Sequence, residues 1–173
     1  MEEIFILRHS DAEDVDGKTV KNDFERKLTD EGIKKAKKIS LFFNALNEEI
    51  DLVLSSPLIR AKETAEIFTN NITPRPKLKT VDFLSSGASC KDIVKGLLLY
   101  SSHKKVVLVG HSPDLEIFLG KLISADHINL KKTTIAKVIL NNNFELSGKL
   151  EWLITPKIVK KFKLKEQATF TNN

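Results

Sequence analysis

The chain has 173 residues, of which 41% are hydrophobic and 29% charged, a balance that excludes wholesale disorder and predicts one soluble domain with a substantial core. No apolar run approaches the roughly 20 residues of a membrane span, and the single cysteine, Cys90, excludes an intrachain disulfide and a thiolate zinc cluster. We therefore expect a cytoplasmic protein without a membrane partner. The net charge of +5 rests on 28 basic residues, of which only four are arginines: Arg8, Arg26, Arg60 and Arg75.

The first predicted elements are a strand, a long loop and a helix. Glu3–Leu7 is a short apolar run typical of a buried strand, and it stops at Arg8-His9. Residues 10–27 are polar and acidic, which predicts a lid-like loop. Thr29 then caps a helix. Its apolar stripe is predicted to consist of Ile33, Ala36, Ile39, Phe43 and Leu46.

The middle of the chain repeats this alternation of strand and helix. Asp51–Leu54 predicts a second strand, and Ser56-Pro57 predicts the start of a second helix. Lys79–Leu84 predicts a third, edge-like strand. Ser89–Asp92 has the pattern of a capping box, so we expect a third helix after it. The second helix should bury Leu58, Ala61, Ala65 and Phe68.

The last third of the chain contains the clearest strand. Lys105–Val109 (KVVLV) is typical of a buried strand, and Gly110-His111 and a helix begun by Ser112-Pro113 follow it. Two later strands are predicted at Ile135–Leu140 and Lys149–Ile154. Residues 157–173 form a Lys-rich C-terminal segment, expected to be a solvated face over Ile158 and Phe162. The lysines are otherwise dispersed over helix faces, so we expect no nucleic-acid partner.

This order of elements predicts an α/β fold, a three-layer sandwich with a mostly parallel central sheet. Ligands of such folds bind at the carboxyl ends of the strands. The strand ending at Leu7 is followed by Arg8-His9, and the strand ending at Val109 by Gly110-His111. Arg60 lies about one helical turn beyond the strand that ends at Leu54. Two of the four arginines and two of the four histidines are therefore expected at one edge of the sheet.

These residue types together indicate a phosphate site. An arginine guanidinium holds phosphate oxygens in a planar fork, which a lysine cannot imitate. The helix starts at Pro57 and Pro113 add backbone N–H groups that favour an anion. One imidazole can act as a nucleophile, and a second can donate to the phosphoryl oxygens.

Several segments match the motifs of a known family. Leu7–His9, Ser55–Thr64 and Val109–His111 resemble the three signature motifs of the histidine phosphatase superfamily, which has the phosphoglycerate-mutase-like fold. Arg26–Gly32 resembles the family's RPLT..G segment at the start of the first helix. The late Leu150–Leu153 and the Gly-His-Ser-Pro-Asp-Leu sequence are most similar to the small SixA-type phosphohistidine phosphatases.

The resemblance implies a role for each residue at the predicted site. His9 would be the catalytic nucleophile that accepts the phosphoryl group. Arg8, Arg60 and His111 would surround the phosphoryl oxygens, and Arg26 would bind substrate at the rim of the pocket. Catalysis would then consist mainly of positioning and charge stabilisation. Water would hydrolyse the phosphohistidine intermediate, with no metal and no cofactor.

The sequence departs from the family pattern at two places. Ser10 follows His9 where the wider family commonly has glycine, a change that a small side chain accommodates. Mutase-like members carry a glutamate general acid between the second and third motifs, whereas residues 82–89 here read DFLSSGAS and offer only Asp82. An alkoxide leaving group needs such an acid, but an imidazole, with a pKa near ~6.5, needs far less help. The missing glutamate therefore favours phosphohistidine as substrate.

We predict a phosphatase that hydrolyses phosphohistidine on a phosphotransfer protein of a bacterial-type signalling or sugar-uptake system. Two alternatives remain open. One is a phosphomonoesterase on small sugar or nucleotide phosphates, with Asp82 or a lid acid as proton donor. The other is a non-enzymatic phosphate- or nucleic-acid-binding module. The lid acids Asp11, Glu13, Asp14 and Asp16 are expected to face solvent or to recognise a basic partner.

Overall fold

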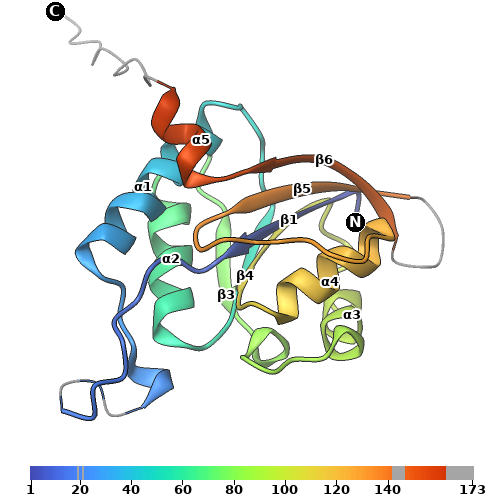
Figure 1. The fold of residues 1–173 in the computed structure, drawn as a ribbon. Helices are drawn as coiled ribbons and strands as arrows, with labels where there is room; N and C mark the ends of the chain where they lie inside the picture. Colours follow the sequence, from blue (N-terminus) through green and yellow to red (C-terminus); the bar gives the residue numbers. More distant parts are fainter. Residues whose placement is uncertain (19, 21, 142–146, 163–173) are drawn as a thin grey trace, which may run out of the picture.

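A computed structural model describes residues 1–18, 20, 22–141 and 147–162, and at its centre lies one six-stranded sheet (Figure 1). The strand order is β3-β2-β4-β1-β5-β6. The first four strands in this order pair in parallel, whereas β5 pairs antiparallel with both β1 and β6. The predicted mostly parallel sheet is therefore confirmed. The strands are β1 (Glu3–Arg8), β2 (Leu52–Ser55), β3 (Lys77–Thr80), β4 (Lys105–Gly110), β5 (Ile135–Leu140) and β6 (Gly148–Ile154).

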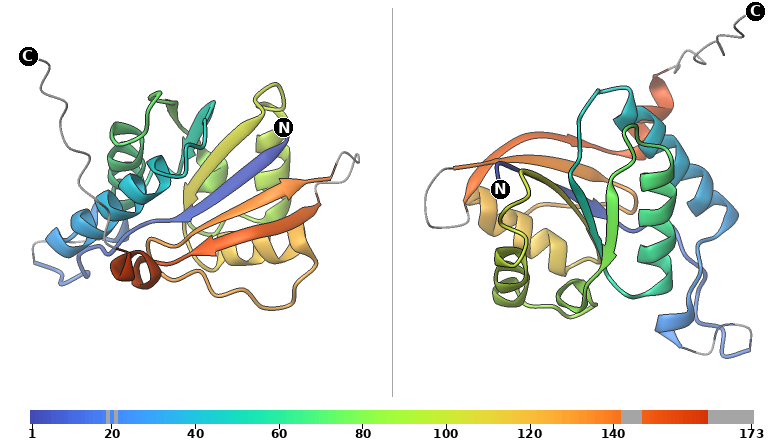
Figure 2. Two further views of the ribbon diagram at one scale, coloured as in Figure 1. Left: turned by 90° about the horizontal axis from the view of Figure 1, so that it is seen from above. Right: turned by 180° about the vertical axis from the view of Figure 1, so that it is seen from behind.

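Five α-helices in the described residues cover the two faces of this sheet (Figure 2). They are α1 (Asp30–Asn44), α2 (Ile59–Asn70), α3 (Cys90–Leu98), α4 (Asp114–Ile123) and α5 (Pro156–Lys161). Two short 3-10 helices, Asp23–Glu25 and Asp82–Leu84, lie in loops. The predicted caps are confirmed, because Thr29 accepts a hydrogen bond from the Gly32 amide and Ser89 forms a capping box with Asp92. No described helix is both long enough and apolar enough to cross a membrane.

The alternation of side chains along the buried strands divides the core into two layers. In β1, Ile4 and Ile6 pack with α3 and α4, whereas Phe5 and Leu7 pack with α1, α2 and α5. Phe5 meets Phe43 of α1 edge-on, with ring centroids 5.3 Å apart. β1 is thus covered on both faces, as its continuous apolar sequence predicts. The three-layer sandwich is confirmed.

Three local predictions need correction. β3 occupies Lys77–Thr80 rather than residues 79–84, because Asp82–Leu84 forms a 3-10 helix. Ile33 is exposed because the buried face of α1 is narrower than the predicted stripe, and Leu46 is exposed beyond the end of that helix at Asn44. In the C-terminal segment Val159 is buried, and both Ile158 and Phe162 are exposed. Residues 163–173 of that segment lie outside the described residues.

The second and fourth helices also begin later than predicted. α2 starts at Ile59, with Leu58 at its N-cap, and α4 starts at Asp114, with Pro113 at its N-cap. Neither N-cap residue accepts a side-chain hydrogen bond from its helix. Ser56 lies two residues before the N-cap of α2, where its hydroxyl accepts from the Leu58 amide at 3.3 Å and contacts His111, as described below.

Candidate active site

Three neighbouring parallel strands bring the predicted site residues to one edge of the sheet. β4 lies between β1 and β2, with Arg8 opposite Gly110 and Ser55 opposite Val109. The chain therefore leaves all three strands at the same level. The rings of His9 and His111 approach with centroids 5.2 Å apart, and Arg60 Nε lies 3.4 Å from His9 Nε2. The structure thus brings His9, His111 and Arg60 together, as the sequence predicts.

The protonation of His9 follows from its hydrogen bonds. Its Nδ1 lies 2.7 Å from the carbonyl oxygen of Ser10, which can only accept, so Nδ1 carries the proton. The lone pair is then on Nε2, which faces Arg60. Burial lowers the pKa of His9 to about 3, and the charges of Arg60 and Arg8 act in the same direction. His9 is therefore neutral at physiological pH, and the lone pair of its Nε2 is directed at Arg60.

Ser10 holds the backbone that carries His9. Its side chain is fully buried, and its Oγ donates to the carbonyl oxygen of Gly32 at 2.7 Å. The hydroxyl of Thr133, also at 2.7 Å, then donates to Ser10 Oγ, and the Ser10 amide donates to Thr64 Oγ1. Ser10 thus connects β1 to α1, to α2 and to the segment before β5. A glycine would lack the hydroxyl bonds, so serine has a structural role here beyond its small size.

His111 is positioned by Ser56, which the sequence analysis assigned only to a helix start. His111 Nε2 lies 2.7 Å from Ser56 Oγ, and both side chains are buried. The Nδ1 of His111 is buried and has no hydrogen-bond partner among the described residues. Burial, together with the nearby charge of Arg60, lowers the pKa of His111 to about 4. This ring nitrogen can therefore serve as a hydrogen-bonding group for a ligand.

Arg60 is the most buried cation of the site, with 4% of its side chain exposed. Its Nη1 donates to the backbone carbonyl of Asp23 at 2.6 Å, and its Nη2 donates to the Asp23 carboxylate at 2.8 Å. Sequence analysis did not identify Asp23. The one indication in the sequence is Asn22, whose side chain caps the short turn that presents Asp23.

Arg26 reaches the site only through Asp23. Its Nη1 lies 3.0 Å from Asp23 Oδ1, its Nη2 pairs with Asp14, and its Nε donates to the Glu13 carbonyl. Partial burial raises the pKa of Asp23, but hydrogen bonds from Arg26 and Arg60 outweigh this effect and lower it. Asp23 is therefore a carboxylate. The two arginines hold it in place between them.

Arg8 stands beside both histidines. Its Nη1 donates to the Leu130 carbonyl at 2.7 Å, and its Nε is buried without a partner among the described residues. Its charge lowers the pKa of His9 and of His111, which places it within electrostatic range of both rings. The fourth arginine, Arg75, is exposed.

Two further acids of the lid-like loop have partners within the protein. Asp11 pairs with Lys35 and Lys132, and the Asp16 carboxylate accepts from the Val20 amide. Asp82 is exposed, and within the described residues its side chain forms no hydrogen bond or ion pair with the four predicted site residues. The described residues contain no group of three or more metal-ligating side chains.

A mostly parallel sheet with Arg8 and two histidines at the ends of adjacent strands, and Arg60 in the first turn of α2, defines an α/β protein with a site suited to a phosphoryl group. Comparison with known proteins agrees. Residues 4–86 match the family model described as histidine phosphatase superfamily (branch 1). An uncharacterized protein of Picosynechococcus sp. (strain ATCC 27264 / PCC 7002 / PR-6) is 31% identical over 141 residues, 77% of this chain and 82% of that protein.

The chain belongs to the histidine phosphatase superfamily (branch 1) and is a phosphatase of that superfamily. It is also 37% identical over 86 residues to the mitochondrial serine/threonine-protein phosphatase Pgam5 of Drosophila mojavensis, a match that covers 49% of this chain and 28% of Pgam5. The structure of the protein histidine phosphatase SixA complexed with tungstate superposes with a TM-score of 0.79. That similarity covers 90% of this chain and 97% of SixA at 22% sequence identity. At this identity the likeness establishes the fold.

Proposed function

We propose that this protein removes the phosphoryl group from phosphohistidine on a phosphotransfer protein, with His9 as the nucleophile. The observation that carries the proposal is the tautomer of His9. Its Nδ1–H is committed to the Ser10 carbonyl, so the lone pair is on Nε2, which accepts a long hydrogen bond of 3.4 Å from Arg60 Nε. A neutral, oriented imidazole next to a buried cation is the arrangement that an attack on a phosphoryl group requires.

The reaction then proceeds in two displacements. His9 Nε2 attacks phosphorus, forming a new P–N bond while the P–N bond to the substrate imidazole breaks. Arg60, Arg8 and the unpartnered Nδ1 of His111 stabilise the charge on the phosphoryl oxygens. For that role His111 Nδ1 carries the proton, and the Ser56 hydroxyl donates to His111 Nε2. Water next attacks phosphorus, breaks the bond to His9 and releases inorganic phosphate.

The state of the nearby carboxylates favours phosphohistidine over phosphate esters. Asp23 reaches the site, but its pKa is lowered by Arg26 and Arg60, so it holds no proton for a leaving group. Asp82 is exposed, and in the described part of the chain its side chain has no hydrogen bond or ion pair with His9, His111 or Arg60. A departing imidazole can take its proton from water, whereas a departing alkoxide requires a donor in the site.

Trapping the phosphoryl-enzyme tests the nucleophile. The substrate is a histidine peptide phosphorylated with radiolabelled phosphoramidate, and the label on the enzyme is mapped after acid-free quenching. His9→Ala should lose both label and turnover while still binding tungstate. The matched control is His127→Ala, at an exposed histidine, which should retain both. Undiminished hydrolysis by His9→Ala, or label at His111, would contradict the mechanism.

A panel of substrates tests the leaving group. The panel contains the phosphohistidine peptide, a phosphoserine peptide, a sugar phosphate and a nucleoside monophosphate. Phosphoserine belongs in it because the relative Pgam5 is named a serine/threonine-protein phosphatase. We expect the highest kcat/KM for the phosphohistidine peptide. Faster hydrolysis of the esters would establish the phosphomonoesterase alternative instead.

A further inference from the structure

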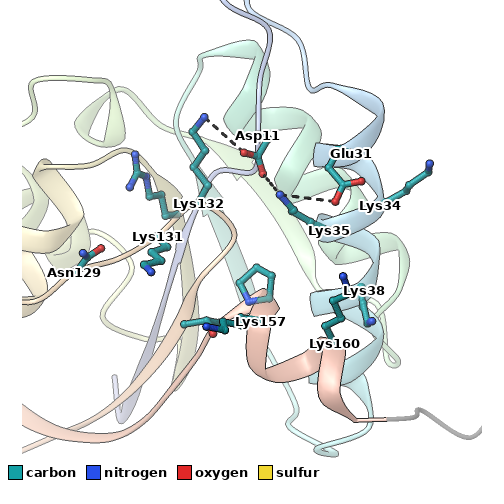
Figure 3. Close-up of a pocket in the computed structure, with 13 residues that line it drawn as sticks. Asp11, Glu31, Lys34, Lys35, Lys38, Asn129, Lys131, Lys132, Lys157 and Lys160 are labelled. Carbon is teal, nitrogen blue, oxygen red and sulfur yellow. Dashed lines mark hydrogen bonds and ion pairs between the residues drawn. The ribbon is translucent and has the colours of Figure 1, made fainter.

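A basic groove of about 930 Å³ has Arg8 among its lining residues (Figure 3). Its walls come from α1, from the segment 129–132 that precedes β5, and from the start of α5. Seven lysines and Arg8 line it, against two carboxylates, Asp11 and Glu31. The three walls are distant in the sequence, so this concentration of charge arises only in the folded chain.

Most of the positive charge in the groove is unpaired. Asp11 pairs with Lys35 at 3.1 Å and with Lys132 at 3.7 Å, and Glu31 pairs with Lys35 as well (Figure 3). The other five lysines have no acidic partner within the described part of the chain. They are Lys34, Lys38, Lys131, Lys157 and Lys160. Five uncompensated ammonium groups around one hollow repel each other and create a strong positive potential, which an anionic partner would relieve.

The groove adjoins the candidate active site through the backbone. Arg8 lines the groove and directly precedes His9 in the chain. Its guanidinium donates to the carbonyl of Leu130, within the groove wall. The Thr133 amide, immediately after that wall, lies 3.2 Å from the carbonyl oxygens of both Arg8 and His9. One wall of the groove is therefore bonded to the backbone that carries His9.

The residue types favour an acidic protein surface over a nucleic acid. The groove has no aromatic side chain among its lining residues, so it offers no stacking platform for bases. Lysine ammonium groups are mobile, strongly hydrated point charges, and Arg8 is the single guanidinium fork. Such a surface attracts carboxylates by charge complementarity and steers their approach without fixing one geometry.

We infer that this groove docks the acidic face of the protein that carries the phosphohistidine. This inference rests on the proposed function, because it places the carrier's histidine beside His9. Docking by charge also supplies selectivity for one carrier, which a small phosphoryl pocket cannot provide.

Two peptides of equal length test the inference. Each contains one phosphohistidine made with phosphoramidate, flanked by glutamates in the first peptide and by glutamines in the second. For the unaltered protein at low salt we expect kcat/KM for the glutamate peptide to exceed that for the glutamine peptide by about tenfold or more. The ratio should fall toward one at about 0.5 M salt, where surface charges are screened.

Charge reversal at selected lysines tests whether the groove causes the preference for the glutamate peptide. The groove variant combines Lys38→Glu, Lys157→Glu and Lys160→Glu, and should reduce the peptide ratio to near one. The control variant carries the same change in net charge on exposed lysines of α3 and α4, outside the groove. It combines Lys91→Glu, Lys95→Glu and Lys121→Glu and should keep the ratio. Equal ratios in the two variants, or no preference in the unaltered protein, would overturn the docking site.

Binding of the unphosphorylated, fluorescently labelled peptides separates docking from catalysis. Anisotropy should show tighter binding of the glutamate peptide, and the groove variant should abolish this difference. That binding result would support docking even if neither phosphopeptide were hydrolysed. A lack of hydrolysis would refute the proposed function and leave the docking site standing. Duplex DNA is the competitor. The unlabelled glutamate peptide and the DNA are compared as competitors at equal concentrations of negative charge. If DNA displaces the labelled glutamate peptide more effectively than the unlabelled peptide does, the groove binds nucleic acid and the inference is overturned.

Discussion

Removing the charge of Asp23 should strengthen the binding of phosphate-like anions. Both Nη groups of Arg60 donate to Asp23, one to the backbone carbonyl at 2.6 Å and the other to the carboxylate at 2.8 Å. A phosphoryl group on His9 needs the same donors, so Asp23 competes with it. Asp23→Asn keeps the side-chain shape and the backbone carbonyl, and it removes only the charge.

The expected gain in tungstate affinity depends on how strongly Asp23 binds Arg60, which in turn depends on how deeply the two side chains are buried. A hydrogen bond to a charged group contributes about 1.5–3 kcal/mol when enclosed by protein. Arg60 is 4% exposed, but the side chain of Asp23 is 47% exposed, which screens the pair. We therefore assign the carboxylate about 1–2 kcal/mol. Since about 1.4 kcal/mol corresponds to a tenfold change, tungstate should bind roughly 5- to 30-fold more tightly to Asp23→Asn.

Isothermal titration with tungstate measures this change. The control is Asp14→Asn, which removes an equal charge from the same loop. Asp14 is fully exposed and pairs only with Arg26 among the described residues, at 3.7 Å. The control therefore reports the general effect of charge, and its affinity should change less than about twofold because exposed pairs contribute little. Equal affinities in the two variants, or weaker binding to Asp23→Asn, would show that Asp23 does not compete for Arg60.

Three further predictions concern the residues that support the site. Ser56→Ala removes the partner of buried His111 Nε2, so thermal unfolding should show a loss of about 1–3 kcal/mol, and turnover should fall. Gly32→Ala would place a methyl group against the Asp11 carbonyl, and denaturant unfolding should show a loss of at least about 1–3 kcal/mol. His9 and His111 have folded pKa values of about 3 and about 4, below the ordinary 6.5. The unfolded chain therefore takes up protons first, so stability should decline as pH falls from about 6.5 to about 4, with a shallower decline in a variant lacking both imidazoles.

The elements of the fold were predictable because each depends on local physics. Continuous apolar runs such as residues 106–109 are typical of strands covered on both faces. The caps at Thr29 and Ser89 depend on groups three residues away. Predictions failed for short elements whose conformation depends on the elements packed against them. Residues 82–84 form a 3-10 helix instead of extending a strand, and of the described residues 157–162 only Val159 reaches the core.

The sequence by itself determined which residues meet at the end of the sheet. His9 and His111 each follow a buried strand, and parallel strands end at a common edge, so their convergence needs no knowledge of distant contacts. Only the tertiary structure decided how these groups are held. The Arg60–Asp23 and His111–Ser56 contacts join residues 37 and 55 positions apart, and the basic groove collects lysines from three separate segments. Such contacts depend on the packing of whole elements against one another, which no local pattern of side chains encodes.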